Sequence, residues 1–316
     1  MIEFRRFQNT DLPRLVKLWH QAGLGRAAAL GIGCDIFDDV VLAQSYFDRD
    51  GLVVAVEGTD VVGFSHAGFG ACPREVTLQQ TDGVICAVVV HPAHRRRGIG
   101  RELVRRAEAY LYERGALTIQ AGPSPGRDPF YYGIYGGAES SGLLESEPLA
   151  IPFFDAMGYA PKSRRLVLQR NLELKGDPVG LRLMNARRST RLESPENPST
   201  RSWWWQTRRG RLDSLEFALL PKAGGDPLAR VTVVGLDFYL PCWGMRAIGL
   251  VDLQVREDAR KKGYGQACLI EVCRRFRQEM VALAEAHVPA DDQPALAVFA
   301  CAGFSPVDSA VVYEKS

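Results

Sequence analysis

The residue types that could do chemistry gather in one stretch, VVVHPAHRRRGIGREL, residues 88–103. A β-branched run leads into a turn with several basic side chains and two glycines, and a helical pattern follows. Glycines let a backbone approach a ligand closely, and the first turn of a helix points unpaired N–H groups and its positive dipole end back at that turn. The stretch therefore predicts an anion site, for which a phosphate is the natural ligand.

Two well-known phosphate loops do not fit this turn. A loop that reaches the terminal phosphates of a nucleoside triphosphate needs Gly-Lys followed by Ser or Thr, but Gly100 is followed by Arg101 and Glu102. A dinucleotide fingerprint needs a third small residue where this chain has Leu103, and it usually opens its domain. Both chemistries are therefore disfavoured.

The turn occurs twice. Arg260-Lys261-Lys262-Gly263-Tyr264-Gly265 matches Arg95-Arg96-Arg97-Gly98-Ile99-Gly100 position by position, with an offset of 263 − 98 = 165 residues. A repeat of that length indicates duplicated domains rather than a solenoid of short units.

The elements that must position the two turns follow the same order in both halves. Alternating and continuous apolar runs predict strands, and the 3.6-residue pattern predicts helices. We expect strands at 2–7, 52–57, 61–69, 83–92, 116–122 and 164–170, and helices at 10–23, 37–47, 99–115 and 149–159. The second half predicts strands at 215–221, 228–240, 248–255, 281–288 and 310–315, and helices at 263–280 and 294–304.

Length and composition agree with two ordinary globular domains. The chain has 316 residues, 46% of them hydrophobic and 24% charged, with a formal net charge of +2. That charge gives no reason to expect nucleic acid or a membrane as a partner, and neither a signal peptide nor a membrane span is predicted. We expect a cytoplasmic protein. Seven cysteines without a CxxC pair predict reduced thiols and no metal site.

Both turns carry a resemblance to a known family. Arg-x-x-Gly-x-Gly after the apolar strand Val88-x-Val90-x-Pro92 resembles the acyl-coenzyme A loop of the GNAT superfamily of N-acyltransferases. The second copy is similar, although Glu257 replaces the usual proline. The stretches FFDAMGY and VFACAGF resemble the later short helix of the family. The resemblance covers most of the chain, as in tandem members such as mycothiol synthase.

The resemblance implies an α/β (α+β) fold of two tandem GNAT-like domains, each a mixed, splayed sheet flanked by helices. It also implies acetyl-coenzyme A as the acyl donor and a primary amine of unknown identity as the acceptor. The residues implied to bind the coenzyme are Val88, Val89, Val90, Arg95, Arg96, Arg97, Gly98, Ile99, Gly100 and Arg101, and, in the second copy, Arg260, Lys262, Gly263, Tyr264 and Gly265.

The expected chemistry is attack of an amine on a thioester. Deprotonating a lysine-like amine at pH 7 costs about 4.6 kcal/mol, so the reaction needs an effective general base. The thiol of the leaving group has a pKa of about 8.5, so its thiolate can leave without a strong general acid. Many family members have a tyrosine acid where this chain has Phe154 and Phe299. Tyr131, Tyr132 and Tyr135 are the candidate replacements, in a long segment over 122–148 that forms either a functional loop or a surface insertion.

No single base stands out. Polar residues on the strands of the first unit are His66, Asp82 and Cys86. Asp252 is the acidic candidate in the second unit; the alternative, which the pattern favours, is a structural or surface aspartate. The stretch GFSHA around Ser65 and His66 is not a nucleophile elbow. That motif is Gly-x-Ser-x-Gly at a turn between a strand and a helix, whereas this stretch ends in alanine and lies within a predicted strand.

We expect an N-terminal domain at 1–170, a basic, Pro-containing linker at 171–199 and a C-terminal domain at 200–316 whose N-terminal helices are shortened. Eight arginines lie between residues 182 and 211, around Trp203–Trp205. One interpretation is that these residues bind single-stranded RNA or an acidic partner. The other is that the tryptophans bury an interdomain seam, and that the arginines are solvated or bind the 3′-phosphate of the coenzyme.

Two hypotheses about function remain. The first is an acetyl-coenzyme A dependent N-acetyltransferase whose catalytic site lies in the first unit. That unit keeps the helices that usually form the wall of the acceptor site. The mycothiol synthase-like tandems, in which the second unit is active, argue for the other unit. The second is a non-catalytic acyl-coenzyme A binding or scaffold protein, since both tyrosine positions are phenylalanine.

Overall fold

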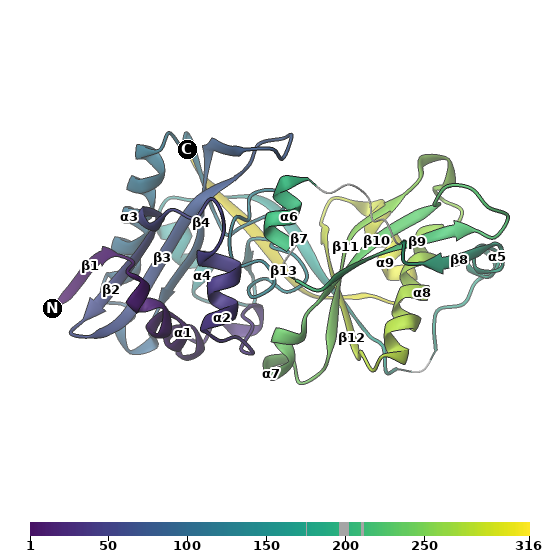
Figure 1. Ribbon diagram of the computed structural model, residues 1–316, viewed down its shortest axis with the longest axis horizontal. Helices are drawn as coiled ribbons and strands as arrows, with labels where there is room; N and C mark the ends of the chain where they lie inside the picture. The colour runs from purple at the N-terminus through teal and green to yellow at the C-terminus, as the bar shows by residue number, and fades with distance from the viewer. Residues whose placement is uncertain (175, 196–201, 210–211) are drawn as a thin grey trace.

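A computed structural model describes residues 1–174, 176–195, 202–209 and 212–316. The chain forms two lobes that lie side by side (Figure 1). None of the helices in these described ranges is long and apolar enough to span a membrane.

The first lobe contains strands β1 (Ile2–Arg6), β2 (Leu52–Glu57), β3 (Asp60–Ala71), β4 (Leu78–Val90), β5 (Thr118–Ala121), β6 (Leu143–Leu144) and β7 (Ala160–Asn171), and helices α1 (Leu12–Gln21), α2 (Cys34–Phe37), α3 (Ile99–Glu113) and α4 (Ala150–Ala156). The expected helix at 37–47 is displaced: α2 begins earlier and continues as a π-turn over Asp38–Leu42.

Helices cover both faces of the first half of the sheet. Pro13 in its first turn fits the start of α1, and Leu15, Leu18 and Trp19 are buried on its inner face. These side chains pack with α2 and with the inner residues of β2 and β3. Ile99 and Leu103 of α3 pack against the opposite face. The two cores hold β4 in the middle of the layer.

The C-terminal part of the chain contains helices α5 (Leu181–Ser189), α6 (Trp203–Arg209), α7 (Leu240–Trp243), α8 (Tyr264–Gln278) and α9 (Gln293–Cys301). Its strands are β8 (Thr190–Glu193), β9 (Ser214–Pro221), β10 (Ala229–Gly235), β11 (Ala247–Val255), β12 (Leu283–Pro289) and β13 (Ser305–Lys315). The segment expected as a linker, 171–199, thus contains α5 and the edge strand β8, which pairs with β9. Residues 175 and 196–199 of that segment lie outside the described residues.

The backbone repeats what the sequence repeats. Arg96 and Gly98 have positive φ angles of 60° and 81°, and Lys261 and Gly263, 165 residues later, have 60° and 88°. After the next helix the offset changes, because Gly158 with φ 84° corresponds to Gly303 with φ 88°. The difference, 165 − (303 − 158) = 20, means that the first unit holds 20 more residues between its fifth strand and that glycine.

The two units exchange their last strands. The described strands form one sheet in the order β1-β2-β3-β4-β5-β13-β7-β12-β11-β10-β9-β8, with β6 also paired to β13. Strand β13 of the second unit pairs with β5 of the first, and β7 of the first pairs with β12 of the second. Figure 1 shows β13, in yellow, running into the lobe that is otherwise purple and blue. The division at residue 170 therefore separates the units in sequence but not in the sheet.

Helix α6 closes the seam between the lobes. Trp204 is fully buried and its ring lies 5.3 Å from that of Tyr46. Arg208 is ion-paired to the buried Asp128, and Arg209 to Asp252. These two arginines are therefore neither solvated nor exposed to RNA or to a coenzyme phosphate, whereas Arg201 and Arg211 lie outside the described residues.

Candidate active site

A cavity of about 680 Å³ opens in the first unit beside β4. It extends from the turn that follows β4 to the long segment between β5 and α4. Of the expected coenzyme residues, those that line it are Val88, Val89, Val90, Arg95, Arg96, Gly98, Gly100 and Arg101.

The sheet splays at this cavity. Strand β4 pairs in parallel with β5 from Asp82 to Ile85, and the pairing ends there. Beyond Ile85, the edge of β4 from Cys86 to Val90 faces the cavity instead of a strand. A free strand edge offers peptide N–H and C=O groups to an extended ligand.

The turn after β4 is shaped for an anion. Gly98 adopts a left-handed conformation and caps α3, so the unpaired N–H groups of the first helical turn lie next to it. Apart from its neighbours in the chain, no heavy atom of the described residues lies within 4 Å of the position that a Cβ on Gly98 would occupy. A ligand can therefore approach the backbone closely at this point.

The side chains of the turn have different roles. Arg95 donates from Nε to the Val90 carbonyl over 3.0 Å and from its second nitrogen to the Ala22 carbonyl, and so fixes the turn against α1. Arg97 lies 3.4 Å from the carboxylate of Glu57. Ile99 is buried in the core. Arg97 and Ile99 do not line the cavity, whereas Arg95, Arg96 and Arg101 do.

A carboxylate that the sequence does not single out also lines the cavity. Glu147 lines it together with Tyr135 and Trp19. If residue 25 had a Cβ atom, that atom would lie 1.6 Å from Oε1 of Glu147. The Glu147 carboxylate can therefore occupy this position only because residue 25 is a glycine. Burial raises the pKa of Glu147, the charge of Asp308 raises it further, and Arg95 opposes both.

The three candidate tyrosines have different surroundings. Tyr131 and Tyr135 line the cavity, and burial raises the pKa of both hydroxyls. The Tyr131 ring stacks on Trp19 at 5.8 Å, and its hydroxyl shares a hydrogen bond of 3.1 Å with His66 Nδ1. The Tyr132 hydroxyl donates to the Ala138 carbonyl over 3.1 Å, away from the cavity, which gives Tyr132 a packing role.

The candidate bases on the strands of the first unit are poorly suited to the role. His66 is fully buried, and burial lowers its pKa to about 3, so it stays neutral. Burial raises the pKa of the Cys86 thiol, which keeps it protonated although it lines the cavity. Asp82 is paired with Arg127 at 2.8 Å. The candidate in the second unit, Asp252, is paired with Arg209 at 2.6 Å.

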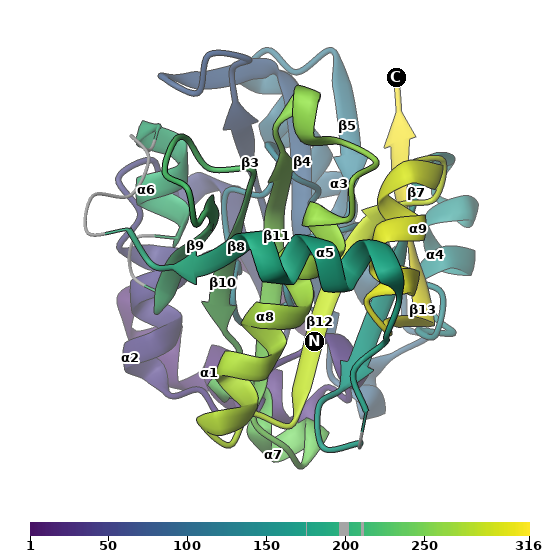
Figure 2. The same cartoon turned by 90° about the vertical axis from the view of Figure 1, so that its right-hand side faces the viewer.

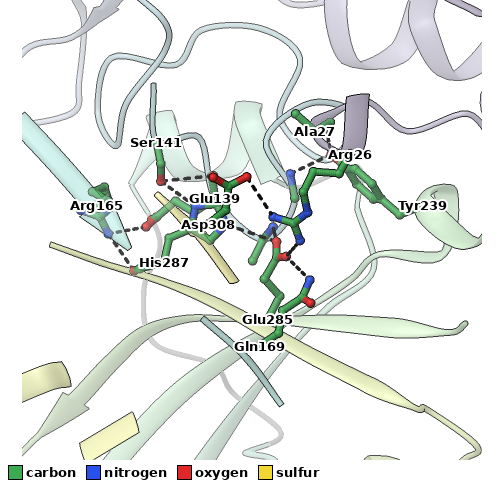
Figure 3. Close-up of polar contacts among 12 residues, drawn as sticks. Arg26, Ala27, Glu139, Ser141, Arg165, Gln169, Tyr239, Glu285, His287 and Asp308 are labelled. Atoms are coloured by element: carbon green, nitrogen blue, oxygen red, sulfur yellow. Dashed lines mark hydrogen bonds and ion pairs between the residues drawn. The ribbon is translucent and has the colours of Figure 1, made fainter. Parts of the chain in front are cut away.

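In the second unit, part of the long segment of the first packs beside the place where the strands separate. Strand β11 pairs with β12 only from Ala247 to Gly249, and Ala138 of the long segment lies there: a Cβ on Gly249 would fall 2.8 Å from its Cβ. The Ala138 N–H donates to Glu285 over 3.0 Å. Figure 3 shows the surrounding network, in which Arg26, Gln169 and His287 also point toward Glu285.

The second turn is also partly covered. A Cβ on Gly263 would lie 3.3 Å from the carbonyl oxygen of Arg182, whereas Gly98 faces open space. Figure 2 shows α5, which carries Arg182, crossing α8. Arg260 donates to the Val255 carbonyl over 3.4 Å, as Arg95 does to Val90. Gly265 packs against Val298, and Tyr264 against the core. The local turn is repeated, but its surroundings are not.

In the part of the chain that the structure describes, no group of three or more His, Cys, Asp or Glu side chains could hold a metal ion.

Comparison with known proteins agrees with the geometry. The profile of the acetyltransferase (GNAT) family matches residues 33–131 and 182–304. A mycothiol acetyltransferase of Corynebacterium efficiens is 27% identical over 269 residues, which cover 80% of this chain and 82% of that protein.

Solved structures show the same fold. A tandem GNAT protein from the clavulanic acid biosynthesis pathway has a TM-score of 0.67 at 18% identity, and the match covers 100% of this chain and 98% of that one. A GCN5-related N-acetyltransferase from Sphaerobacter thermophilus has a TM-score of 0.59 at 17% identity, with 99% and 95% covered.

Proposed function

Because the chain belongs to the GNAT family and is therefore an acetyltransferase of tandem architecture, we propose that its first unit transfers the acetyl group of acetyl-coenzyme A to a primary amine bound beside Glu147. The observation that carries this proposal is the continuous cavity from the open turn at Gly98 to a carboxylate with a raised pKa. The packing of Ala138 beside the place where the strands of the second unit separate supports the assignment to the first.

The residues of the first unit suit the donor. The amides of the turn and of the first residues of α3 bind the pyrophosphate, and Arg96 and Arg101 add positive charge at the cavity wall. The free edge of β4 from Cys86 to Val90 pairs with the pantetheine arm. That arrangement directs the thioester toward the end of the cavity that Glu147 and Tyr135 line.

Glu147 is the general base in this proposal. It accepts a proton from the ammonium form of the acceptor, or from the attacking nitrogen as the C–N bond forms and the C–S bond breaks. A base works best when its pKa lies near the working pH, and burial moves the pKa of Glu147 in that direction. The aromatic rings of Trp19 and Tyr135 pack against the body of the acceptor.

The leaving thiolate needs little help. Its pKa is about 8.5, and a tyrosine whose pKa is raised by burial holds its proton more tightly than the sulfur does. Tyr135 therefore donates a hydrogen bond to the sulfur and keeps its proton, while the thiolate is protonated by water. This division of labour explains how the site works with phenylalanine at position 154.

Calorimetry and turnover together test the proposal. Acetyl-coenzyme A is titrated into the wild type, Gly98→Glu and the matched variant Gly263→Glu, and thiol release is followed with 2-phenylethylamine, tryptamine, glucosamine, lysine, spermidine and a tripeptide with a free N-terminus. We expect Gly98→Glu to lose both binding and turnover, because its carboxylate enters the phosphate site. Gly263→Glu keeps both. The opposite pattern would place the activity in the second unit, and tight binding without turnover would contradict the acceptor class.

A further inference from the structure

The segment that leads to Glu147 in the first unit is held by a strand that comes from the second. We propose that Asp308, on β13, is a positioning residue for the proposed reaction: it anchors the segment that presents Glu147 to the cavity. This inference rests on the proposed function, because it assigns Glu147 the role of base.

Strand β13 holds the segment that leads to Glu147. Leu143 and Leu144 pair with Val311 and Ala310, and the Glu145 N–H donates to the Ser309 carbonyl over 2.8 Å. At the next residue the Asp308 carboxylate takes over from the backbone. It accepts hydrogen bonds from both the N–H, at 3.3 Å, and the hydroxyl of Ser146. Glu147 follows at once and turns into the cavity.

The geometry of β13 aims Asp308 at this task. The register with β7 shifts between Pro306 and Asp308, so Val307 is an extra residue in the strand. Such a bulge redirects the side chain that follows it. The Asp308 side chain is only 5% exposed. Ser163 is its counterpart on β7 by the 145-residue offset, so the carboxylate is not repeated in the other unit.

The charges around Asp308 fit a positioning role. Arg26 lies 3.8 Å from Asp308 and 2.9 Å from Glu285, so it is shared between two carboxylates (Figure 3). Three groups face Glu147 itself: Asp308 from β13, Arg95 from the phosphate turn and Tyr135 from the long segment. Burial raises the pKa of Glu147, the Asp308 charge raises it too, and Arg95 lowers it. Removal of the Asp308 charge therefore makes Glu147 a weaker base.

The test uses the full-length enzyme and the fastest acceptor of the six-amine panel. Profiles of kcat/KM against pH are measured for the wild type, Asp308→Asn and Asp308→Ala, with Glu147→Gln as the reference for loss of the base. Asp237→Asn is the matched control, since Asp237 is exposed and paired only at the surface with Arg246. The folded fraction of each variant is measured by circular dichroism at every pH, so that a change in folding is not taken for a shift of the midpoint.

We expect Asp308→Asn to shift the acid limb of the profile to lower pH, because the negative neighbour of Glu147 is gone. The limb due to the amine itself stays in place, since the acceptor is the same. Asp308→Ala also loses the anchor of Ser146, and kcat/KM for the amine falls at least about tenfold while the KM for acetyl-coenzyme A is unchanged. Asp237→Asn behaves as the wild type.

Two results would overturn the inference, and they differ in what else they overturn. Coincident profiles for the wild type and Asp308→Asn, with unchanged kcat/KM in Asp308→Ala and an inactive Glu147→Gln, would remove the role of Asp308 and leave the proposed base. Full activity of Glu147→Gln would remove the proposed base and the role of Asp308 with it.

Discussion

Two glutamates only two residues apart have opposite surroundings, and this contrast supports Glu147 as the proposed base. Glu147 faces the cavity, whereas Glu145 is paired with Arg164 at 2.6 Å and accepts from the Ser309 hydroxyl. We expect Glu147→Gln to lower kcat/KM for the amine about 100-fold or more. The wild-type kcat/KM falls as the pH drops through the raised pKa of Glu147, since the deprotonated carboxylate is the active form. Thiol-release assays across the pH range measure both effects.

The control for this substitution is Glu145→Gln, which removes a charge from the same segment. Its kcat/KM stays within about twofold of the wild type, as for other substitutions outside the site. Equal losses in the two variants would mean that the segment, and not the carboxylate at 147, matters.

The tyrosines can be separated by a smaller effect. A hydrogen bond from Tyr135 to a leaving thiolate involves a charged partner, so Tyr135→Phe lowers kcat by about tenfold. Tyr132→Phe leaves kcat unchanged, because the Tyr132 hydroxyl donates to Ala138 outside the cavity. Single-turnover thiol release distinguishes the two variants, and a larger loss in Tyr132→Phe would reverse the assignment.

Sequence alone could not have separated these residues. The phosphate turn was predicted because its determinants, Arg95 to Gly100, are adjacent in the chain. Tyr131, Tyr132 and Tyr135 are equally adjacent, but which of them faces the cavity depends on packing against Trp19 and Arg209. Glu147 depends on Asp308, 161 residues away. Such contacts leave no periodic signal in a single sequence.

At the scale of elements, most strands and helices were predictable, but α6, α7 and the exchange of the last strands were not. The strand expected at 228–240 ends at Gly235, and α7 begins at Leu240. Hydrophobic periodicity predicts a strand at 310–315, and β13 covers Ser305–Lys315. The same pattern fits a strand that pairs within its own unit and a strand that pairs with the other unit. In both cases the same apolar face of the strand is buried, so the pattern does not distinguish the two. The partner of β13 therefore had to come from the structure, as did β8 and α5 in the expected linker.

Helix α6 shows how a short element can stabilise a seam. Trp204 is fully buried beside Tyr46, whereas its neighbour Trp203 is only partly buried. We expect Trp204→Ala to lower the free energy of unfolding by about 3–5 kcal/mol, the usual cost of a large cavity. Trp203→Ala costs clearly less. Urea denaturation followed by circular dichroism gives both values, and equal losses would contradict a specific role for Trp204.

At the scale of the whole molecule, the exchanged strands join two GNAT folds into one sheet. In the proposed reaction the second unit serves the first, because its last strand holds the segment that carries Glu147. Duplication then supplies a structural part to the proposed site. A chain built in this way unfolds in one cooperative transition, since neither half keeps its central sheet without the other.

Glu285, at the seam, links this cooperativity to pH. Burial alone would raise its pKa, but the hydrogen bond with His287 and the charge of Arg26 lower it overall. A carboxyl group whose pKa is depressed by folding contributes stability above its unfolded pKa and loses it as the pH falls through the folded pKa. Glu285→Gln leaves Arg26 without its closest carboxylate. We expect this substitution to lower the free energy of unfolding by about 2 kcal/mol at pH 7. The value is below the range for fully buried pairs because Arg26 is 27% exposed.

Urea denaturation at pH 7 and at pH 4, followed by tryptophan fluorescence and by circular dichroism, tests both points. The difference between the wild type and Glu285→Gln shrinks as the pH falls below the ordinary pKa of a glutamate, because the unfolded chain then binds a proton at position 285 that the folded carboxylate, with its lowered pKa, does not yet take up. Gln169→Ala, which removes a neutral partner of the same carboxylate, gives a loss that changes less with pH. The two probes give coincident transitions. Separate transitions for the two lobes would show that the shared sheet does not make them unfold together. A Glu285→Gln effect that is the same at both pH values would show that the Glu285 charge does not link stability to pH.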